Sequence, residues 1–324
     1  MIKIDLITGF LGSGKTTFIK KYAKYFMDKG SRIGILENDF GAVNVDRMLL
    51  QELQGDKCDI ETVSGACDRN CHKRRFKTKL ISMGMLGYDR VVIEPSGIFD
   101  VDEFFDSLHE APLDRWYEIG NVIAVADAQL PDDLSEQSEY LLASQTANAG
   151  LVILSRTQFA SSQDIIKTIG HINQALKNAG CTRTFSADIM TKDWCQLTGE
   201  DFYIIQASGY HKESYIKRYT ADSVYRSLYF MNLSLTPKAL YQKIEVLFAN
   251  HHYGKIYRVK GFIKDNKQWL ELNAVNGSIC FTPIQNGQEV FIVIGENLNK
   301  ESINELLAKQ SLPSDESCAE KSMR

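Results

Sequence analysis

Residues 9–16 read Gly-Phe-Leu-Gly-Ser-Gly-Lys-Thr and fit the phosphate-binding loop pattern G-x-x-x-x-G-K-[ST]. The apolar run 2–7 before them predicts a buried strand, and residues 16–26 predict a helix that ends near Gly30. A strand, a glycine loop and a helix in this order aim backbone N–H groups and a helix N-terminus at an anion. A chance glycine-rich turn is the alternative, which the flanking strand and helix disfavour. We therefore expect a phosphate-binding β-α unit at the start of the first domain.

The residues of this loop have separate expected roles. Glycines keep side chains out of the way, so that the backbone can approach a phosphate closely. The Lys15 ammonium is expected to reach the β- and γ-phosphates, and the Thr16 hydroxyl to ligate Mg²⁺. Nucleotide contacts are expected from Gly9, Gly12, Ser13, Gly14, Lys15, Thr16 and Thr17.

Composition limits the class of protein. The 324 residues are enough for two domains, and the 44% hydrophobic and 24% charged content is typical of a folded globular protein. The net charge of −4 argues against broad binding to nucleic acid or to an anionic membrane. With no leader and no membrane-spanning run predicted, the expected compartment is the cytoplasm. Seven cysteines in a reducing compartment suggest thiols or metal ligands rather than disulfides.

The first part of the chain alternates strand-like and helix-like segments. Its strand-like runs are apolar throughout, which predicts strands covered on both faces, as in a parallel sheet. These runs lie at 2–7, 32–37, 89–94, 121–127, 151–154 and 203–205. We therefore expect a doubly wound α/β domain over residues 1–208, with mostly parallel strands and its ligand at their carboxyl ends.

The pattern changes after Gly209. Residues 209–223 are polar and tyrosine-rich and predict a linker, and residues 311–324 are polar and predict a disordered tail. Between them, residues 224–310 predict a small α+β domain. Its expected strands and helices, separated by Asp-Asn and Asn-Gly turns, lie at 227–235, 237–248, 255–263, 268–275, 278–283, 289–294 and 299–309.

Two acidic segments follow predicted strands and extend the phosphate site. Glu94 ends the strand 91–94, and Gly97 follows three residues later. A carboxylate there can serve Mg²⁺, directly or through water, and the Gly97 N–H can contact a γ-phosphate. Asp39, after the second strand, can hold Mg²⁺ or orient the attacking water, although a plain surface turn explains it equally well. We expect Lys15, Asp39 and Glu94 to be the catalytic residues.

The chain resembles the CobW family of P-loop GTPases, within the CobW/HypB/UreG class. The resemblance rests on the loop 9–17, Asn38-Asp39-Phe40-Gly41 with Asp46, Glu94-Pro95-Ser96-Gly97, Asp127-Ala128 and Arg258-Val259-Lys260-Gly261. It covers nearly the whole chain. It implies a GTPase that serves as a metallochaperone or as an insertase for zinc or cobalt centres.

The chain departs from the family where a base-reading Asn-Lys-x-Asp is expected. The matching residues are Ser155-Arg156-Thr157-Gln158. An aspartate accepts two hydrogen bonds from guanine, whereas Gln158 has one acceptor oxygen and an opposing N–H₂ group. The loss is on the order of 1–3 kcal/mol per bond to a charged acceptor. Ser155 and Arg156 remain candidate nucleotide contacts, the latter by stacking on the base. GTP stays the first expectation, with ATP or relaxed specificity as the alternative.

The chain also departs from the family's Cys-x-Cys-Cys motif, because Cys67 and Cys71 are separated by three residues. On a helix they could share one face, and with Cys58 or His72 they could make a tetrahedral site for Zn²⁺ or Co²⁺. Small buried cysteines are the alternative.

Three functions remain open from the sequence. The first is a switch that hydrolyses GTP (or ATP) with Mg²⁺ and delivers a metal or metal cofactor to a client metalloprotein. The second is an ATP-dependent activator or chaperone of a corrinoid protein, and the third is a binding module in which nucleotide is structural. A homodimer is a further expectation for this chain, and no nucleic-acid or membrane partner is expected.

Overall fold

The computed structural model describes most of the chain as two compact units, Met1–Tyr219 and Thr220–Arg324. The described residues are 1–38, 49–63, 69–97, 99, 101–216, 225–231, 233, 235–265, 268–284, 287 and 289–308. Within these residues, no helix is long and apolar enough to cross a membrane.

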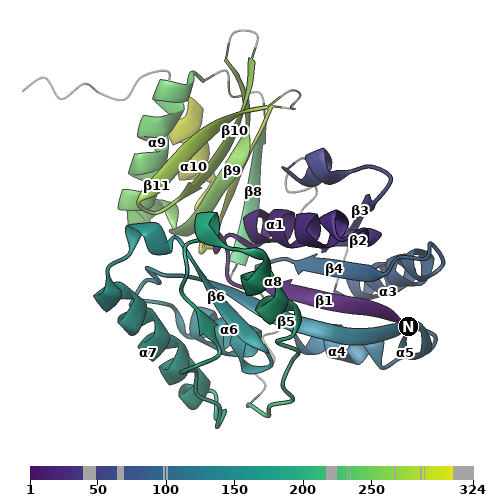
Figure 1. Cartoon of the computed structure of the whole chain (residues 1–324). Helices are drawn as coiled ribbons and strands as arrows, with labels where there is room; N and C mark the ends of the chain where they lie inside the picture. Colours follow the sequence, from purple (N-terminus) through teal and green to yellow (C-terminus); the bar gives the residue numbers. More distant parts are fainter. Residues whose placement is uncertain are drawn as a thin grey trace, which may run out of the picture. The chain divides into compact units, whose positions relative to one another are not determined.

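The first unit is built on a seven-stranded parallel sheet with the order β3-β2-β4-β1-β5-β6-β7 (Figure 1). Its strands are β1 (Ile2–Thr8), β2 (Ile33–Asn38), β3 (Cys58–Val63), β4 (Arg90–Pro95), β5 (Tyr117–Asp127), β6 (Leu151–Ser155) and β7 (Ile189–Met190). The P-loop strand β1 lies in the interior of this sheet, between β4 and β5. The loop that follows β1 therefore has strands on both sides.

Helices cover both faces of this sheet. The longer helices are α1 (Lys15–Asp28), α3 (Arg69–Gly84), α4 (Asp102–Leu108), α5 (Leu113–Trp116), α6 (Glu136–Ala147), α7 (Ser162–Asn178) and α8 (Gly199–Gln206). One apolar core joins the sheet to α3, α4, α6 and α7, and the other joins it to α1 and α8. Successive strand residues enter opposite cores, which explains why the strand sequences are apolar throughout. The predicted doubly wound α/β fold is confirmed.

The prediction of a strand at 203–205 is wrong, because these residues belong to helix α8. The Thr198 side chain accepts from the Asp201 N–H, and the Asp201 carboxylate accepts from the Thr198 N–H, which forms a capping box. Phe202 and Ile205 are buried, whereas Tyr203 and Ile204 are 65% and 57% exposed. This spacing is helical, so a continuous apolar run was misread as a buried strand.

The first part of the expected linker is bound to the first unit. Gly209 O accepts from the Val122 N–H at 3.0 Å, and the His211 N–H donates to Asn148 O at 3.0 Å. The Ile216 N–H donates to Ala179 O at 2.7 Å. Three residues between 209 and 216 thus have backbone partners in the first unit. The expected tail 311–324 lies outside the described residues.

The second unit is an antiparallel sheet with the order β11-β10-β9-β12-β8 and two helices. Its elements are β8 (Tyr225–Met231), α9 (Pro237–Ala249), β9 (Lys255–Asp265), β10 (Gln268–Val275), β11 (Ser278–Ile284), β12 (Val290–Glu296) and α10 (Lys300–Ala308). Thr236 caps α9 by accepting from the Ala239 N–H, and Pro237 occupies its first turn. The predicted α+β architecture of this part is confirmed.

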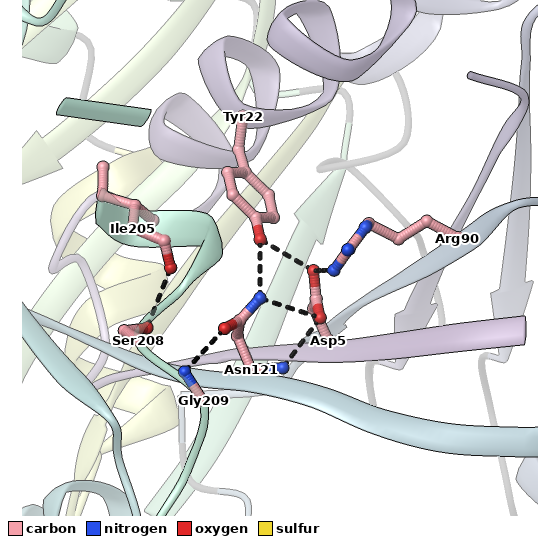
Figure 2. A network of polar contacts seen from close by, with 7 residues as sticks. All are labelled: Asp5, Tyr22, Arg90, Asn121, Ile205, Ser208 and Gly209. Atoms are coloured by element: carbon pink, nitrogen blue, oxygen red, sulfur yellow. Dashed lines mark hydrogen bonds and ion pairs between the residues drawn. The ribbon is translucent and has the colours of Figure 1, made fainter. Parts of the chain in front are cut away.

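A buried polar network ties the first helix to the centre of the sheet (Figure 2). Asp5 on β1 is fully buried and accepts from Tyr22 Oη of α1 at 2.7 Å and from the Asn121 N–H of β5 at 2.8 Å. It also forms an ion pair with Arg90 of β4. Asn121 Oδ1 in turn accepts from the Gly209 N–H at 2.8 Å. Burial and the Asp5 charge raise the pKa of Tyr22, so its hydroxyl stays a donor at physiological pH.

Candidate active site

The loop after β1 has the backbone geometry of an anion cradle. Gly9 has φ +142°, and a methyl group built on its Cα would lie 2.1 Å from the Val125 carbonyl oxygen. Only glycine therefore allows the loop to pass this close to β5. Gly14 (φ +102°) is the N-cap residue of α1, so the N–H groups of the first helical turn point toward the loop.

Lys15 lies inside the loop. Its side chain is buried, and Nζ donates to Gly9 O at 2.9 Å and to Phe10 O at 3.2 Å. An ammonium group held by main-chain carbonyls at this point places a positive charge where the helix N-terminus is also electropositive. The structure thus places the Lys15 ammonium within the loop after β1, and its contact with phosphate stays a prediction.

The two residues expected at Mg²⁺ lie in direct contact. Thr16 Oγ1 donates to Glu94 Oε1 at 2.6 Å, and both residues are buried. Hydroxyl and carboxylate oxygens suit Mg²⁺, which binds through few protein ligands and keeps several waters. The donor set therefore fits a magnesium ion that also contacts a bound triphosphate.

Glu37 lies next to this pair and had no separate role in our sequence analysis. It pairs with Glu94 in the register between β2 and β4, so the two carboxylates point to the same face of the sheet. Both are buried. The only signal for this neighbour was that each carboxylate comes at the end of an apolar strand. Asp39, two residues later, lies outside the described residues.

Gly97 is packed against the phosphate-binding loop. A methyl group on its Cα would lie 2.7 Å from the Leu11 backbone nitrogen and 2.8 Å from Leu11 Cα. These are backbone atoms, so a side chain at this position would push the two loops apart. The structure therefore places Gly97 against the loop that follows β1, and its contact with a γ-phosphate stays a prediction.

The expected base-reading segment is also at the site, with a changed role for its arginine. Ser155 is buried at the end of β6, and Arg156 has φ +56°. The Arg156 guanidinium forms an ion pair with Asp127 and donates through Nη2 to Gly12 O at 2.9 Å. Arg156 thus ties the ends of β5 and β6 to the phosphate-binding loop. Gln158 is exposed.

Trp194 is a neighbour of this site that our sequence analysis missed. Its ring lies against Gly14, where a methyl group would be 3.1 Å from Cη2, and it tilts onto Phe18 with centroids 5.7 Å apart. Ser155 Cβ lies beside the same point of Gly14, at 3.5 Å. The segment around Trp194 has no periodic pattern, so no sequence signal marked it.

The structure separates two of the expected thiol ligands. Cys58 pairs with Ile33 at one end of β3, whereas Asn38, at the other end of β2, pairs with Val63. Five residues of strand span about 16 Å, and Cys71 lies at the Asn38 end, next to His72. Cys58 is fully buried, and burial raises the pKa of its thiol to about 11. It is therefore placed as a core residue on the α1 side of the sheet.

The histidine beside Cys71 has another partner. His72 is buried, and its Nε2 lies 2.6 Å from Asn38 Oδ1. This contact fixes the start of α3 to the end of β2. Cys67 lies outside the described residues, and within the described ranges no three Cys, His, Asp or Glu side chains cluster as a metal site.

Comparison with known proteins identifies the family of the chain. Residues 3–181 match the family model "CobW/HypB/UreG, nucleotide-binding domain", and residues 232–310 match "Cobalamin synthesis protein cobW C-terminal domain". The chain is 31% identical over 175 residues to the zinc chaperone YjiA of Escherichia coli (strain K12), which is 50% of this chain and 52% of that protein. It is 27% identical over 191 residues to the zinc chaperone CobW of Sinorhizobium sp, covering 51% and 53% of the two chains.

Among solved structures, the Zn(II)-bound YjiA GTPase from E. coli aligns with 96% of this chain and 99% of its own, at 19% identity and a TM-score of 0.36. The chain spans about half the length of the curated relatives it matches. The two family models cover both units and include the phosphate-binding loop. The chain belongs to the CobW/HypB/UreG family.

Proposed function

We propose that this chain is a GTP-hydrolysing switch of the CobW type that delivers a metal ion to a client metalloprotein. The observation that carries the proposal is the Thr16–Glu94 contact at 2.6 Å, beside the buried Lys15 ammonium. The residues proposed as a magnesium ligand (Thr16), an acidic group (Glu94) and a phosphate-binding cation (Lys15) thus come from two parts of the chain, the start of α1 and the end of β4.

Each of these groups has a defined task in phosphoryl transfer. The loop N–H groups and Lys15 hold the β- and γ-phosphates, and Thr16 and Glu94 hold Mg²⁺ directly or through water. The metal ion, when bound, offsets the charge of the phosphates. Gly97 contacts the terminal phosphate through its N–H, so hydrolysis changes the contacts of the loop that follows β4.

The metal is proposed to be cargo, held by thiolates near the nucleotide. Cys71 precedes His72, which contacts Asn38 at the end of β2, and Glu37 is the residue before Asn38 in that strand. Cys67 and Cys71 are the proposed ligands, and thiolates suit Zn²⁺ and Co²⁺. Relatives named zinc chaperones favour zinc. The described distances argue against Cys58 as a third ligand.

One observation favours a second candidate. Gln158 is exposed and lacks the paired acceptors that read guanine. The same fold with ATP as its nucleotide would then serve as an activator or chaperone of a corrinoid protein. Competition between GTP and ATP for the purified protein with Mg²⁺, with and without a corrinoid protein, separates the two candidates.

The catalytic proposal is tested with Lys15→Ala and Glu94→Gln. We expect Lys15→Ala to abolish triphosphate binding, because it removes the buried cation from the loop, and Glu94→Gln to bind nucleotide without hydrolysing it. Lys24→Ala, a removal of an exposed ammonium from the same helix, is the matched control and should behave as wild type. Normal turnover in Lys15→Ala and Glu94→Gln would contradict these roles.

The cargo proposal is tested by zinc titration of wild type and a Cys67→Ser/Cys71→Ser variant, each with and without triphosphate. The control variant is Cys195→Ser/Cys280→Ser, which changes two exposed thiols elsewhere in the chain. We expect only the first variant to lose zinc binding. Equal zinc stoichiometry in all three proteins would refute the thiol site.

A further inference from the structure

Gln145 of helix α6 contacts the loop that is proposed to sense the terminal phosphate. Its Nε2 donates to the Gly97 carbonyl oxygen at 2.9 Å, although the two residues are 48 positions apart. The Gln145 side chain is 1% exposed. A primary amide at this depth is rare unless it has a specific partner, so the contact calls for an explanation beyond packing.

The explanation lies in the glycine. Gly97 has to lack a side chain because it packs on the Leu11 backbone, but a glycine has wide freedom in φ and ψ. The peptide before Gly97 is held through Ser96 O, which accepts from the Phe99 N–H at 3.0 Å. The peptide after Gly97 is held by Gln145. One hydrogen bond thus holds the peptide that carries the Gly97 N–H, and another holds the peptide that carries its carbonyl, so the two together restrict the dihedral angles of Gly97 between them.

The oxygen atom of the Gln145 amide has a different environment from its nitrogen. Gln145 Oε1 is buried and has no hydrogen-bond partner among the described residues. A buried acceptor without a partner is unfavourable, so a rearrangement of the loop that brings an N–H to it is favoured. The amide can therefore respond to a change in the loop after Gly97 as well as hold it.

We propose that Gln145 is a positioning residue for the nucleotide reaction: it orients the Gly97 N–H toward a terminal phosphate and couples that loop to helix α6. This inference rests on the proposed function. It assigns to Gln145 an effect on triphosphate recognition and turnover, and none on recognition of the diphosphate, because a diphosphate has no group at Gly97.

The test compares Gln145→Met, which keeps the length of the side chain and removes both polar atoms, with Thr146→Val. Thr146 is buried on the same helix and donates only within it, to Leu142 O and Ala143 O. Affinities for a non-hydrolysable triphosphate and for the diphosphate, with Mg²⁺ and the purine that wild type prefers, are measured with kcat and KM. Gln145→Met should lower the triphosphate-to-diphosphate affinity ratio about fivefold to tenfold, the weight of one buried hydrogen bond.

We expect kcat to fall in Gln145→Met as well, while Thr146→Val matches wild type. A ratio equal to that of wild type would overturn the inference, as would an equal loss of both affinities, which marks a structural role. If Gln145→Met does not fold, Gln145→Asn replaces it, because it retains the amide but is one methylene too short to reach Gly97. The triphosphate-to-diphosphate affinity ratio of Gln145→Asn then tests the inference in the same way. Wild type that binds no triphosphate would instead contradict the proposed function.

Discussion

The buried carboxylate of Asp5 offers a quantitative test of what holds helix α1 to the sheet. Asp5→Ala removes the acceptor for Tyr22 Oη at 2.7 Å and for the Asn121 N–H at 2.8 Å. It also leaves the Arg90 guanidinium, only 11% exposed, without its counter-ion. Removal of one partner from a buried ion pair costs about 3–5 kcal/mol of unfolding free energy, because the other charge remains buried.

Intermediate variants divide this loss among its causes. Asp5→Asn keeps an acceptor oxygen for the Asn121 N–H but loses the charge opposite Arg90, so its loss should be smaller than that of Asp5→Ala. Tyr22→Phe removes one hydroxyl and should cost about 1.5–3 kcal/mol, the range for a hydrogen bond to a charged group. Asp28→Asn is the control, because Asp28 is exposed and its pairing with Lys24 is worth about 0.5 kcal/mol or less.

The assay is urea denaturation followed by tryptophan fluorescence. The chain has three tryptophans, and a Trp269→Phe background leaves only Trp116 and Trp194, which both lie in the first unit. The midpoint then reports the unit that contains Asp5 rather than an average over two domains. A loss below about 1 kcal/mol in Asp5→Ala would show that water or Arg90 movement replaces the carboxylate, and the reasoning would fail.

Three further predictions concern the site and its surroundings. Gly97→Ala places a methyl group 2.7 Å from the Leu11 nitrogen, so hydrolysis measured by phosphate release should fall about tenfold or more. Diphosphate affinity should be retained, and unchanged turnover would contradict the packing argument. Gln158→Asp restores two acceptors and should raise the GTP-to-ATP affinity ratio about tenfold, whereas Gln158→Asn should leave it unchanged. Burial raises the pKa of Cys58 to about 11, so its neutral thiol supports the folded state below about pH 9, and this support is lost as pH rises to 11. Wild type should therefore lose more stability than Cys58→Val over that interval, on the order of 2–3 kcal/mol, and parallel stability curves would refute the assignment.

The strands could be predicted from the sequence where helices cover both faces of the sheet. Strands β1, β2, β4, β5 and β6 are largely covered on both faces, so each is rich in apolar residues, which predicts it directly. Strand β3 lies at the sheet edge and is only partly buried, and its sequence Cys-Asp-Ile-Glu-Thr-Val gives no such run. Helix α8 was mistaken for a strand because its apolar residues are consecutive, although its cap at Thr198 was visible in the sequence.

In the candidate site, too, residues of one motif could be predicted, whereas contacts between residues far apart in the sequence could not. Lys15, Thr16 and the loop glycines were predicted from one motif, and Glu94 from the strand that it ends. His72 was weighed as a metal ligand because it follows Cys71, but adjacent helical residues point about 100° apart, and its partner Asn38 is 34 positions away. Contacts of this kind, made between elements rather than within one, leave no periodic signal in a single sequence.

The interior place of β1 in the sheet has a consequence for biosynthesis. Lys3 pairs with Arg90, and Ile2 pairs with Tyr117, so the two neighbouring strands are translated about 90–115 residues after their partners in β1. On the ribosome, the loop emerges early, and its neighbouring strands β4 and β5 are both present only after β5 has left the exit tunnel. A bound nucleotide can therefore stabilise this domain only late in its synthesis, and the growing chain has to remain soluble until then without that help.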